Sequence, residues 1–361
     1  MKTPSAADAP AGAGAGEPYS HRGLTYPFGR RAPDAGEVIA LAPGIGWARL
    51  PVPGSLRHVN IWLLDDDQGV AVVDTGLDTP DCRQGWEQLL AGPLADRTIT
   101  RILCTHFHPD HVGLAGSLTR QFDVKLWMTR SEWLLARMLL LGASPHVPEE
   151  AVGYWRAAGW SEDRIEEERQ AGWGRFAAAV TPLPASYVRI ADGDTLAIGA
   201  RRWRVVIGSG HSPEHACLVD EENGVLIAGD QVLPRITSNV SLMMTEPDGD
   251  PLGDWLASIA RLQALPDDLL VLPSHGEPFV GLRARLQALD AGHRDRLEAL
   301  HRHLEQPRRA VDCFHVLFGR SEFANVMGLA TGEALAHLRR LEVEGRAIRE
   351  VVNATWWFRA C

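Results

Sequence analysis

The residues with the clearest chemical potential form one short run, Cys104-Thr105-His106-Phe107-His108-Pro109-Asp110-His111. The run follows a short apolar stretch, which predicts a loop at the end of a strand. Residues two apart in an extended loop project to the same side, so His106 and His108 can converge on one ion. Asp110 and His111 then face a neighbouring position. Imidazole and carboxylate suit zinc, and core packing does not explain this spacing.

Three further candidate ligands lie downstream, each just beyond an apolar stretch of strand length. They are His211 in Gly208-Ser209-Gly210-His211, Asp230 after Val225-Leu226-Ile227-Ala228-Gly229, and His275 in Leu272-Pro273-Ser274-His275. Any one of them alone is more typical of a hydrogen-bonded loop residue than of a metal ligand. Their shared position beyond strands favours the ligand interpretation.

At this point the sequence resembles the metallo-β-lactamase superfamily, whose hallmark is HxHxDH followed at long spacing by His, Asp and His. All these positions are filled, and Val72-Val73-Asp74-Thr75-Gly76 matches the early family strand that ends in Asp-Thr-Gly. The resemblance spans roughly residues 38–280. It implies an α/β fold, an αββα sandwich with the metals at one edge between two sheets.

The resemblance also implies a role for each residue. Asp74 would orient the ligand loop without touching metal. A histidine at position 108, where redox di-iron relatives carry Glu, favours two Zn²⁺ ions, with iron or manganese as alternatives. The implied ligands are His106, His108 and His211 for the first metal, Asp110, His111 and His275 for the second, and Asp230 as the bridge.

The chemistry expected of such a centre is hydrolysis. Two ions about 3.5 to 4 Å apart lower the pKa of a bridging water and polarise a carbonyl or phosphoryl oxygen. The family analogy makes Asp110 the catalytic residue that orients the resulting hydroxide and accepts a proton. His215 either points into the substrate pocket or is a hydrogen-bonded loop residue. The sequence contains no GxSxG elbow and no Walker-type loop.

The elements that must position these residues alternate between strands and helices, which predicts mixed α/β layers. Apolar runs of strand length include 59–64, 70–73, 100–103, 203–207, 216–219 and 225–228, and helical stretches include 80–91 and 254–265. Residues 1–36 are rich in Ala, Gly and Pro and predict a flexible leader. The catalytic domain is expected over residues 37–282.

Two segments depart from this alternation. Residues 131–179 have helical periodicity and predict a helical insertion, whose tryptophans are packing residues or line an apolar pocket. Its acidic triplet Glu166-Glu167-Glu168 predicts a solvated face. Residues 283–361 predict helices followed by a hairpin over 347–359, a small domain of winged-helix type.

Composition and charge exclude several classes of function. The chain has 361 residues and a formal net charge of −10, which opposes a general role in binding nucleic acid or acidic membranes. Its five scattered cysteines predict neither a disulfide framework nor a CxxC zinc site. No run approaches the roughly 18 apolar residues of a membrane span. We therefore expect a cytoplasmic protein without a membrane partner.

The expected function is a binuclear zinc hydrolase that attacks a small-molecule ester, thioester or lactone. The domain order resembles a bacterial subgroup of metallo-β-lactamase-fold hydrolases, and it is similar to proteins that include an endoribonuclease and polyketide thioesterases. An endoribonuclease or phosphodiesterase is therefore the alternative. A DNA- or RNA-binding regulator with a structural metal site is the alternative from another class. Nucleic acid is the less favoured partner, and homo-oligomerisation is open.

Overall fold

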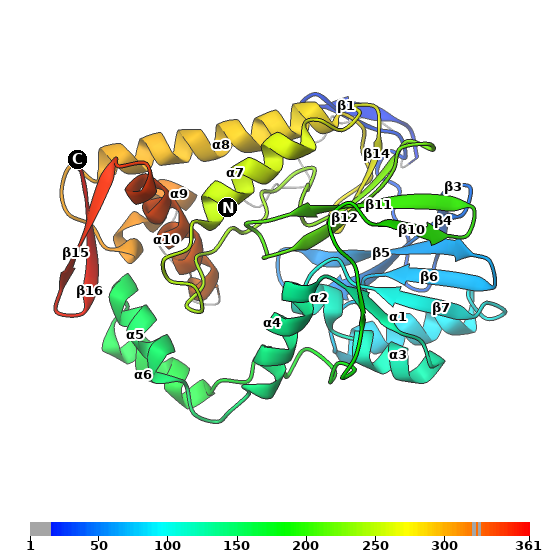
Figure 1. The fold of residues 1–361 in the computed structure, drawn as a ribbon, viewed down its shortest axis with the longest axis horizontal. Coiled ribbons are helices and arrows are strands. Elements are labelled where there is room, and N and C mark those ends of the chain that lie inside the picture. The colour runs from blue at the N-terminus through cyan, green and yellow to red at the C-terminus, as the bar shows by residue number, and fades with distance from the viewer. Residues whose placement is uncertain (1–15, 320–322, 324–325) are drawn as a thin grey trace.

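In the computed structural model, which describes residues 16–319, 323 and 326–361, two β-sheets pack face to face (Figure 1). The first sheet has the order β3-β4-β5-β6-β7-β8-β9, and the second has the order β10-β11-β12-β13-β14. The strands of the first sheet are β3 (Ile39–Ala42), β4 (Ile45–Val52), β5 (Arg57–Asp66), β6 (Gly69–Val73), β7 (Ile99–Leu103), β8 (Leu126–Met128) and β9 (Val188–Arg189). Those of the second are β10 (Thr195–Ile198), β11 (Arg201–Gly208), β12 (His215–Asp220), β13 (Val225–Gly229) and β14 (Leu270–Pro273).

Alternating side chains explain why the sheets need cover on both faces. Along β5, Val59, Ile61 and Leu63 join one hydrophobic cluster with the outer helices. Trp62 and Leu64 point the other way, into the cluster between the two sheets. Successive strand residues face opposite sides, so a strand that is apolar at both sets of positions must be buried on both.

Helices supply that outer cover. Trp86 of α1 packs against the first sheet, and Trp255 of α7 packs against the second. These layers confirm the αββα sandwich. The helices of the two outer layers are α1 (Pro80–Ala91), α2 (Pro109–Val112) and α3 (Ala115–Phe122) beside the first sheet, and α7 (Pro251–Leu262) and α8 (Leu282–His303) beside the second.

The strand directions bring several loops to one edge of the sandwich. β6 and β7 run parallel in the first sheet, and β13 and β14 run parallel in the second. The loops that follow these four strands therefore leave the sheets at their carboxyl ends, where open α/β sheets commonly hold their functional residues. The motif 104–111 is one of these loops.

The insertion is helical, as expected, and comprises α4 (Arg130–Leu141), α5 (Glu149–Ala158) and α6 (Glu162–Ala171). Trp155 and Trp160 stack on each other with ring centroids 5.2 Å apart. The expectation of a solvated acidic triplet is wrong for Glu168. Its carboxylate is buried between Arg164 and Arg175, because two cations compensate its burial.

The C-terminal segment contains the predicted helices and hairpin. The turn between the last two strands has Asn353 and Ala354 at positive φ, 50° and 63°, as a two-residue hairpin of type I′ requires. A winged-helix arrangement stays a prediction. The elements are the 3₁₀ turn η2 (Ala310–Cys313), α9 (Phe314–Phe318), α10 (Met327–Val343), β15 (Ala347–Val352) and β16 (Thr355–Ala360).

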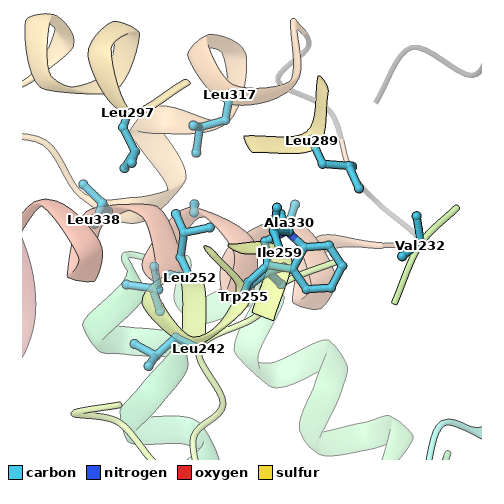
Figure 2. Packing of buried hydrophobic residues seen from close by; sticks show 14 of the residues in the cluster. Val232, Leu242, Leu252, Trp255, Ile259, Leu289, Leu297, Leu317, Ala330 and Leu338 are labelled. Atoms are coloured by element: carbon cyan, nitrogen blue, oxygen red, sulfur yellow. The ribbon is translucent and has the colours of Figure 1, made fainter. Parts of the chain in front are cut away.

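One hydrophobic cluster runs through the second sheet and the C-terminal helices without a break. Figure 2 shows Trp255 and Ile259 of α7 beside Ala330 at the start of α10. The same cluster contains Leu226 of β13 and Leu338 of α10. The C-terminal segment therefore shares its core with the sandwich.

From residue 19 onward the segment expected to be a flexible leader is ordered instead, which corrects that expectation. Residues 1–15 lie outside the described residues. β1 (Tyr19–His21) and β2 (Leu24–Tyr26) form a hairpin whose Tyr19, Leu24 and Tyr26 are buried. Tyr26 packs against Phe279, which explains the order despite the loop-like composition. In the described part of the chain, no helix has the length and apolar character needed to cross a bilayer.

A buried hydrogen bond joins the insertion to the C-terminal helix and makes the first prediction. Trp160 Nε1 donates to Thr331 Oγ1 at 2.9 Å. We expect Thr331→Val to lower the free energy of unfolding by about 1 to 3 kcal/mol, because the indole N–H is left buried without a partner. Thr98→Val, at an exposed threonine, is the control. Equal denaturant midpoints for the two variants would contradict the prediction.

Candidate metal centre

The motif loop is fixed by the strand before it and the short helix after it. β7 ends at Leu103, and His106 follows it fully buried. His108 stands directly before α2, with Pro109 at the first helical position, where a missing N–H costs nothing. α2 then carries Asp110 and His111. The short connection from strand to helix therefore brings the side chains of four candidate ligands, two from the loop and two from α2, close together.

Three imidazoles form the first group. His106 Nε2 lies 2.9 Å from His108 Nδ1, and His108 Nδ1 lies 3.0 Å from His211 Nε2. The third side of the triangle, from His211 Nε2 to His106 Nε2, measures 3.2 Å. His211 therefore joins the motif from a loop more than one hundred residues away.

Asp110, His111 and His275 form the second group. Asp110 Oδ2 lies 3.3 Å from His275 Nε2 and 3.5 Å from His111 Nε2. Each of these atoms lies within 4.8 Å of the others, close enough to hold one metal ion.

Asp230 stands between the two groups. Its Oδ2 lies 3.4 Å from His211 Nε2, and its Oδ1 lies 3.4 Å from His275 Nε2 and 3.7 Å from His111 Nε2. One carboxylate oxygen thus faces each group, which is the arrangement a bridging ligand needs.

The far ring nitrogens show that these imidazoles present lone pairs to the shared space. His211 Nδ1 donates to Asn239 O and His275 Nδ1 donates to His58 O, both at 2.7 Å. His111 Nδ1 donates to the Asp74 carboxylate at 2.9 Å. A neutral imidazole with a hydrogen on one nitrogen accepts at the other, and metal-ligating histidines are held in this way.

Unpartnered atoms show that the residues fit a metal. His111 Nε2, His275 Nε2 and Asp230 Oδ1 are buried, and none of them has a hydrogen-bond partner among the residues that the structure describes. A buried polar atom without a partner is costly, and a divalent cation would satisfy all three at once. The donor set of imidazole and carboxylate is the one that zinc accepts, so the site fits divalent transition metals.

The electrostatics of the metal-free site differ between the groups. Burial and the neighbouring imidazoles lower the pKa of His108 to about 3 and hold the pKa of His106 well below its ordinary value. Burial also opposes charge on His111, but the carboxylates of Asp110, Asp74 and Asp230 raise its pKa to about 9. The second group therefore attracts positive charge.

Comparison with known proteins agrees with this geometry. Residues 54–275, more than half of the chain, match the model of the metallo-β-lactamase superfamily. The chain belongs to the metallo-β-lactamase superfamily. Residues 297–361 also match the model of a metallo-β-lactamase-like C-terminal domain.

Relatives extend the match over most of the chain. A probable metallo-hydrolase, YqjP of Bacillus subtilis, is 26% identical and aligns with 85% of this chain and 93% of its own length. The acyl-coenzyme A thioesterase MBLAC2 of Gallus gallus is 29% identical over 66% of this chain and 80% of its own. A β-lactamase domain protein structure from Burkholderia ambifaria is 38% identical, with a TM-score of 0.85 over 94% of this chain and 97% of its own. The chain is thus a metal-dependent hydrolase of the metallo-β-lactamase fold.

Asp74 lies where the superfamily pattern places an orienting residue. It follows β6 at φ 65° and is fully buried. Its Oδ1 accepts from the Thr105 N–H at 2.8 Å, and its Oδ2 accepts from His111 Nδ1. One carboxylate therefore fixes both the start of the motif loop and the ring of a candidate ligand.

Of the two interpretations of His215, the structure favours the hydrogen-bonded residue over one that points into a substrate pocket. Its side chain is fully buried, and its Nε2 accepts the main-chain N–H of Asp230 at 3.0 Å. Gly229 approaches this ring so closely that an added Cβ would lie 2.4 Å from it. His215 thus supports the backbone that delivers Asp230.

Two supporting residues gave no signal in the sequence. Glu132 of α4 is buried and accepts the main-chain N–H groups of Phe107 and Glu214 at 2.9 and 2.7 Å, joining the motif loop to the loop of His211. Burial raises the pKa of Glu132 to about 7. Asn239, which holds His211, donates in turn to buried Glu333 of α10 at 3.0 Å. The C-terminal helix therefore reaches the metal centre through one intermediate residue.

We expect Asp74→Asn to weaken metal binding by about 10- to 100-fold, because an amide cannot both accept from His111 and keep the negative charge that favours its orientation. Elemental analysis during titration with a chelator measures the loss. Asp123→Asn is the matched control, since Asp123 is exposed and has a similar left-handed backbone, φ 52°. Equal metal retention in both variants would refute the role of Asp74.

The pKa of His111 predicts how the stability of the metal-free protein depends on pH. Its pKa is raised from 6.5 to about 9, so the folded state binds this proton more tightly than the unfolded state. The stabilisation is complete below about pH 6.5 and is lost as pH rises through about 9. We expect the melting temperature to fall over this interval. The metal-loaded protein should not show this loss, because binding requires the neutral ring. A metal-free melting temperature that rises with pH would contradict the prediction.

Proposed function

We propose that this chain is a binuclear zinc hydrolase of small-molecule acyl substrates, with thioesters as the first class to test and esters and lactones as neighbours. The observation that carries the proposal is the pair of ligand groups that share Asp230. A structural zinc site is usually closed and rich in cysteine, whereas this set of histidines and aspartates is typical of a catalytic site.

The proposed ligands divide as the two groups do. His106, His108 and His211 would hold one ion, and Asp110, His111 and His275 the other, with Asp230 shared. When bound, such ions supply an activated water and positive charge for the oxygen of the substrate carbonyl.

Asp110 is the proposed catalytic residue. Burial opposes its ionisation, but His111 and His275 hold the pKa of Asp110 below its usual range. It is therefore a carboxylate at neutral pH. Its side chain is 16% exposed, so an incoming water can donate a hydrogen bond to it and transfer a proton to its oxygen.

A pocket with an aromatic wall in the insertion supports an acyl substrate. It encloses about 200 Å³ and is lined by Trp155, Trp173 and Phe176, together with the ion pair of Glu168 and Arg175. The Phe176 ring lies 6.3 Å from that of Phe107, which stands between two proposed ligands. Trp155 therefore agrees with both interpretations of the insertion's tryptophans, because it lines the pocket and also packs against Trp160. The thioesterase activity named for the chicken relative supports the same substrate class.

Two arginines of α10, which a phosphate backbone could contact, are already paired with carboxylates. Arg339 bonds to Glu342 at 2.7 Å, and Arg340 bonds to Asp250 at 2.7 Å and Glu344 at 2.9 Å. A nucleic acid would have to displace these carboxylates before it gained a phosphate contact, so the pairing favours an acyl substrate over RNA.

We expect Asp110→Asn to lower kcat for thioester hydrolysis by at least about 100-fold, because the amide keeps the size of the side chain but cannot accept the proton. Kinetics with S-acetyl-N-acetylcysteamine, on protein of measured metal content, provide the test. Asp96→Asn, at an exposed aspartate that is not one of the proposed ligands, should keep wild-type kinetics.

The substrate class is tested on the wild-type protein with acyl thioesters, p-nitrophenyl esters, homoserine lactones, bis-p-nitrophenyl phosphate and single-stranded RNA. Turnover of the first three classes with about two zinc equivalents supports the proposal. Preferred cleavage of RNA would replace it with the nuclease alternative. Salt-dependent nucleic-acid binding without turnover of any substrate would favour the regulator.

A further inference from the structure

A second cavity, distinct from the acyl pocket, gathers three arginines from three segments of the chain. It encloses about 230 Å³, and its lining includes Pro234 and Arg235 from the segment after Asp230. Arg235 in turn bonds to Glu277, two residues after His275. Arg22 comes from the turn between β1 and β2, Arg235 from the loop after β13, and Arg285 from the start of α8. Convergence of three distant segments on one small cavity indicates a built site.

The charges in this arginine pocket do not balance. Arg235 is paired, with its Nε 3.0 Å from Glu277. Arg285 donates only to main-chain oxygens, those of Leu233 and Ile236 at 2.5 and 2.6 Å. Among the described residues, Arg22 has no hydrogen bond or ion pair, and no Asp or Glu lines the cavity. Two guanidinium groups of the cavity wall therefore have no carboxylate partner: Arg22, which is exposed at the rim, and Arg285, which is partly buried.

The partial burial of Arg285 makes its lack of a carboxylate partner energetically unfavourable. Burial lowers its pKa to about 10, so it still carries its charge at neutral pH. A partly buried cation is normally accompanied by a carboxylate or another anion. Its Nε and Nη2 are held by the two carbonyls, which fixes the plane of the guanidinium and leaves Nη1 for a ligand.

The rest of the wall is also preorganised. Arg235 lies over the Tyr26 ring, with its Cζ 5.0 Å from the ring centroid, and its Nη2 donates to the Tyr19 hydroxyl. Fixed guanidinium groups match the oxygens of a phosphate in a way that mobile lysines do not. A net charge of about +2 suits a phosphate dianion better than a single carboxylate.

We propose that this pocket binds a phosphate group. The volume of about 230 Å³ suits a single phosphate group with a short attached chain. Two sources share the chemistry, free inorganic phosphate and the phosphate of a phosphopantetheine-type thiol that carries the acyl group. The second source rests on the proposed thioesterase function. In either case the bound anion would contact Arg235, which follows Asp230 in the chain and bonds to Glu277 beside the His275 loop.

Calorimetry on the metal-loaded protein tests the proposal with three probes: pantetheine, 4′-phosphopantetheine and inorganic phosphate. The first two carry the same thiol, so their difference reports on the phosphate alone. We expect 4′-phosphopantetheine to bind at least about tenfold more tightly than pantetheine, as charge-assisted hydrogen bonds predict.

Arg22→Asn is the decisive variant. Arg22 and Gly23 both have positive φ, 52° and 77°, and Asn-Gly is the preferred pair in such a turn, so the variant should fold. It should lose most of the tenfold preference. Arg283→Gln, an exposed arginine in the same first turn of α8 as Arg285, removes equal charge outside the pocket and should keep the preference. Arg285→Lys, which keeps the charge but loses the planar fork, should weaken phosphate binding as well.

The outcomes separate the proposals. Inorganic phosphate that binds wild type and is lost in Arg22→Asn, with no preference for 4′-phosphopantetheine, supports the pocket with free phosphate as its ligand. Binding of every probe that is equal in wild type, Arg22→Asn and Arg283→Gln overturns it, as does no phosphate binding. Turnover of S-acetyl-N-acetylcysteamine, which has no phosphate, tests the thioesterase function separately.

Discussion

The crowding of lone pairs at the sheet edge is the constraint on which the rest of this structure depends. Nitrogens of His106, His108 and His211 approach within 3.2 Å of one another, and Asp230 adds a carboxylate to the same space. Such groups repel or compete unless a cation lies among them. The rings must therefore be fixed by hydrogen bonds on their far side. Asp74 accepts from His111, the His58 carbonyl accepts from His275, and the Asn239 carbonyl accepts from His211.

Those outer contacts explain which parts of the site could be predicted from sequence. The motif 104–111 is local, so its spacing alone indicated convergence of its side chains. His211, Asp230 and His275 follow strands, and the structure brings all three to the motif. Asn239 acts on His211 through a main-chain oxygen, and His58 does the same for His275, 217 residues away. A main-chain contact leaves no signature in the residue type, so no pattern could have identified these two.

The same reasoning applies to the fold. The apolar run 225–228 predicted a strand, and the strand Val225–Gly229 is buried at every position. The strand Ile45–Val52 contains Gly46, Arg49 and Pro51, which mask its alternation. Arg49 is tolerated there because it donates to Asn60 and to the Gly276 carbonyl and lies over the Trp47 ring. Tertiary contacts thus override local propensity where a strand borders the site.

The polar residues of α10 explain why the C-terminal segment is not an independent appendage. Thr331 and Glu333 are buried, and a helix that buries such groups needs partners from elsewhere. Thr331 accepts from Trp160 of the segment between α5 and α6, and Glu333 accepts from Asn239, which holds His211. The helix therefore contacts both the insertion and the loop of a proposed ligand. Its arginines Arg339 and Arg340 are paired with carboxylates, and its buried polar groups are bonded to these two segments, so α10 helps to position the loop of His211.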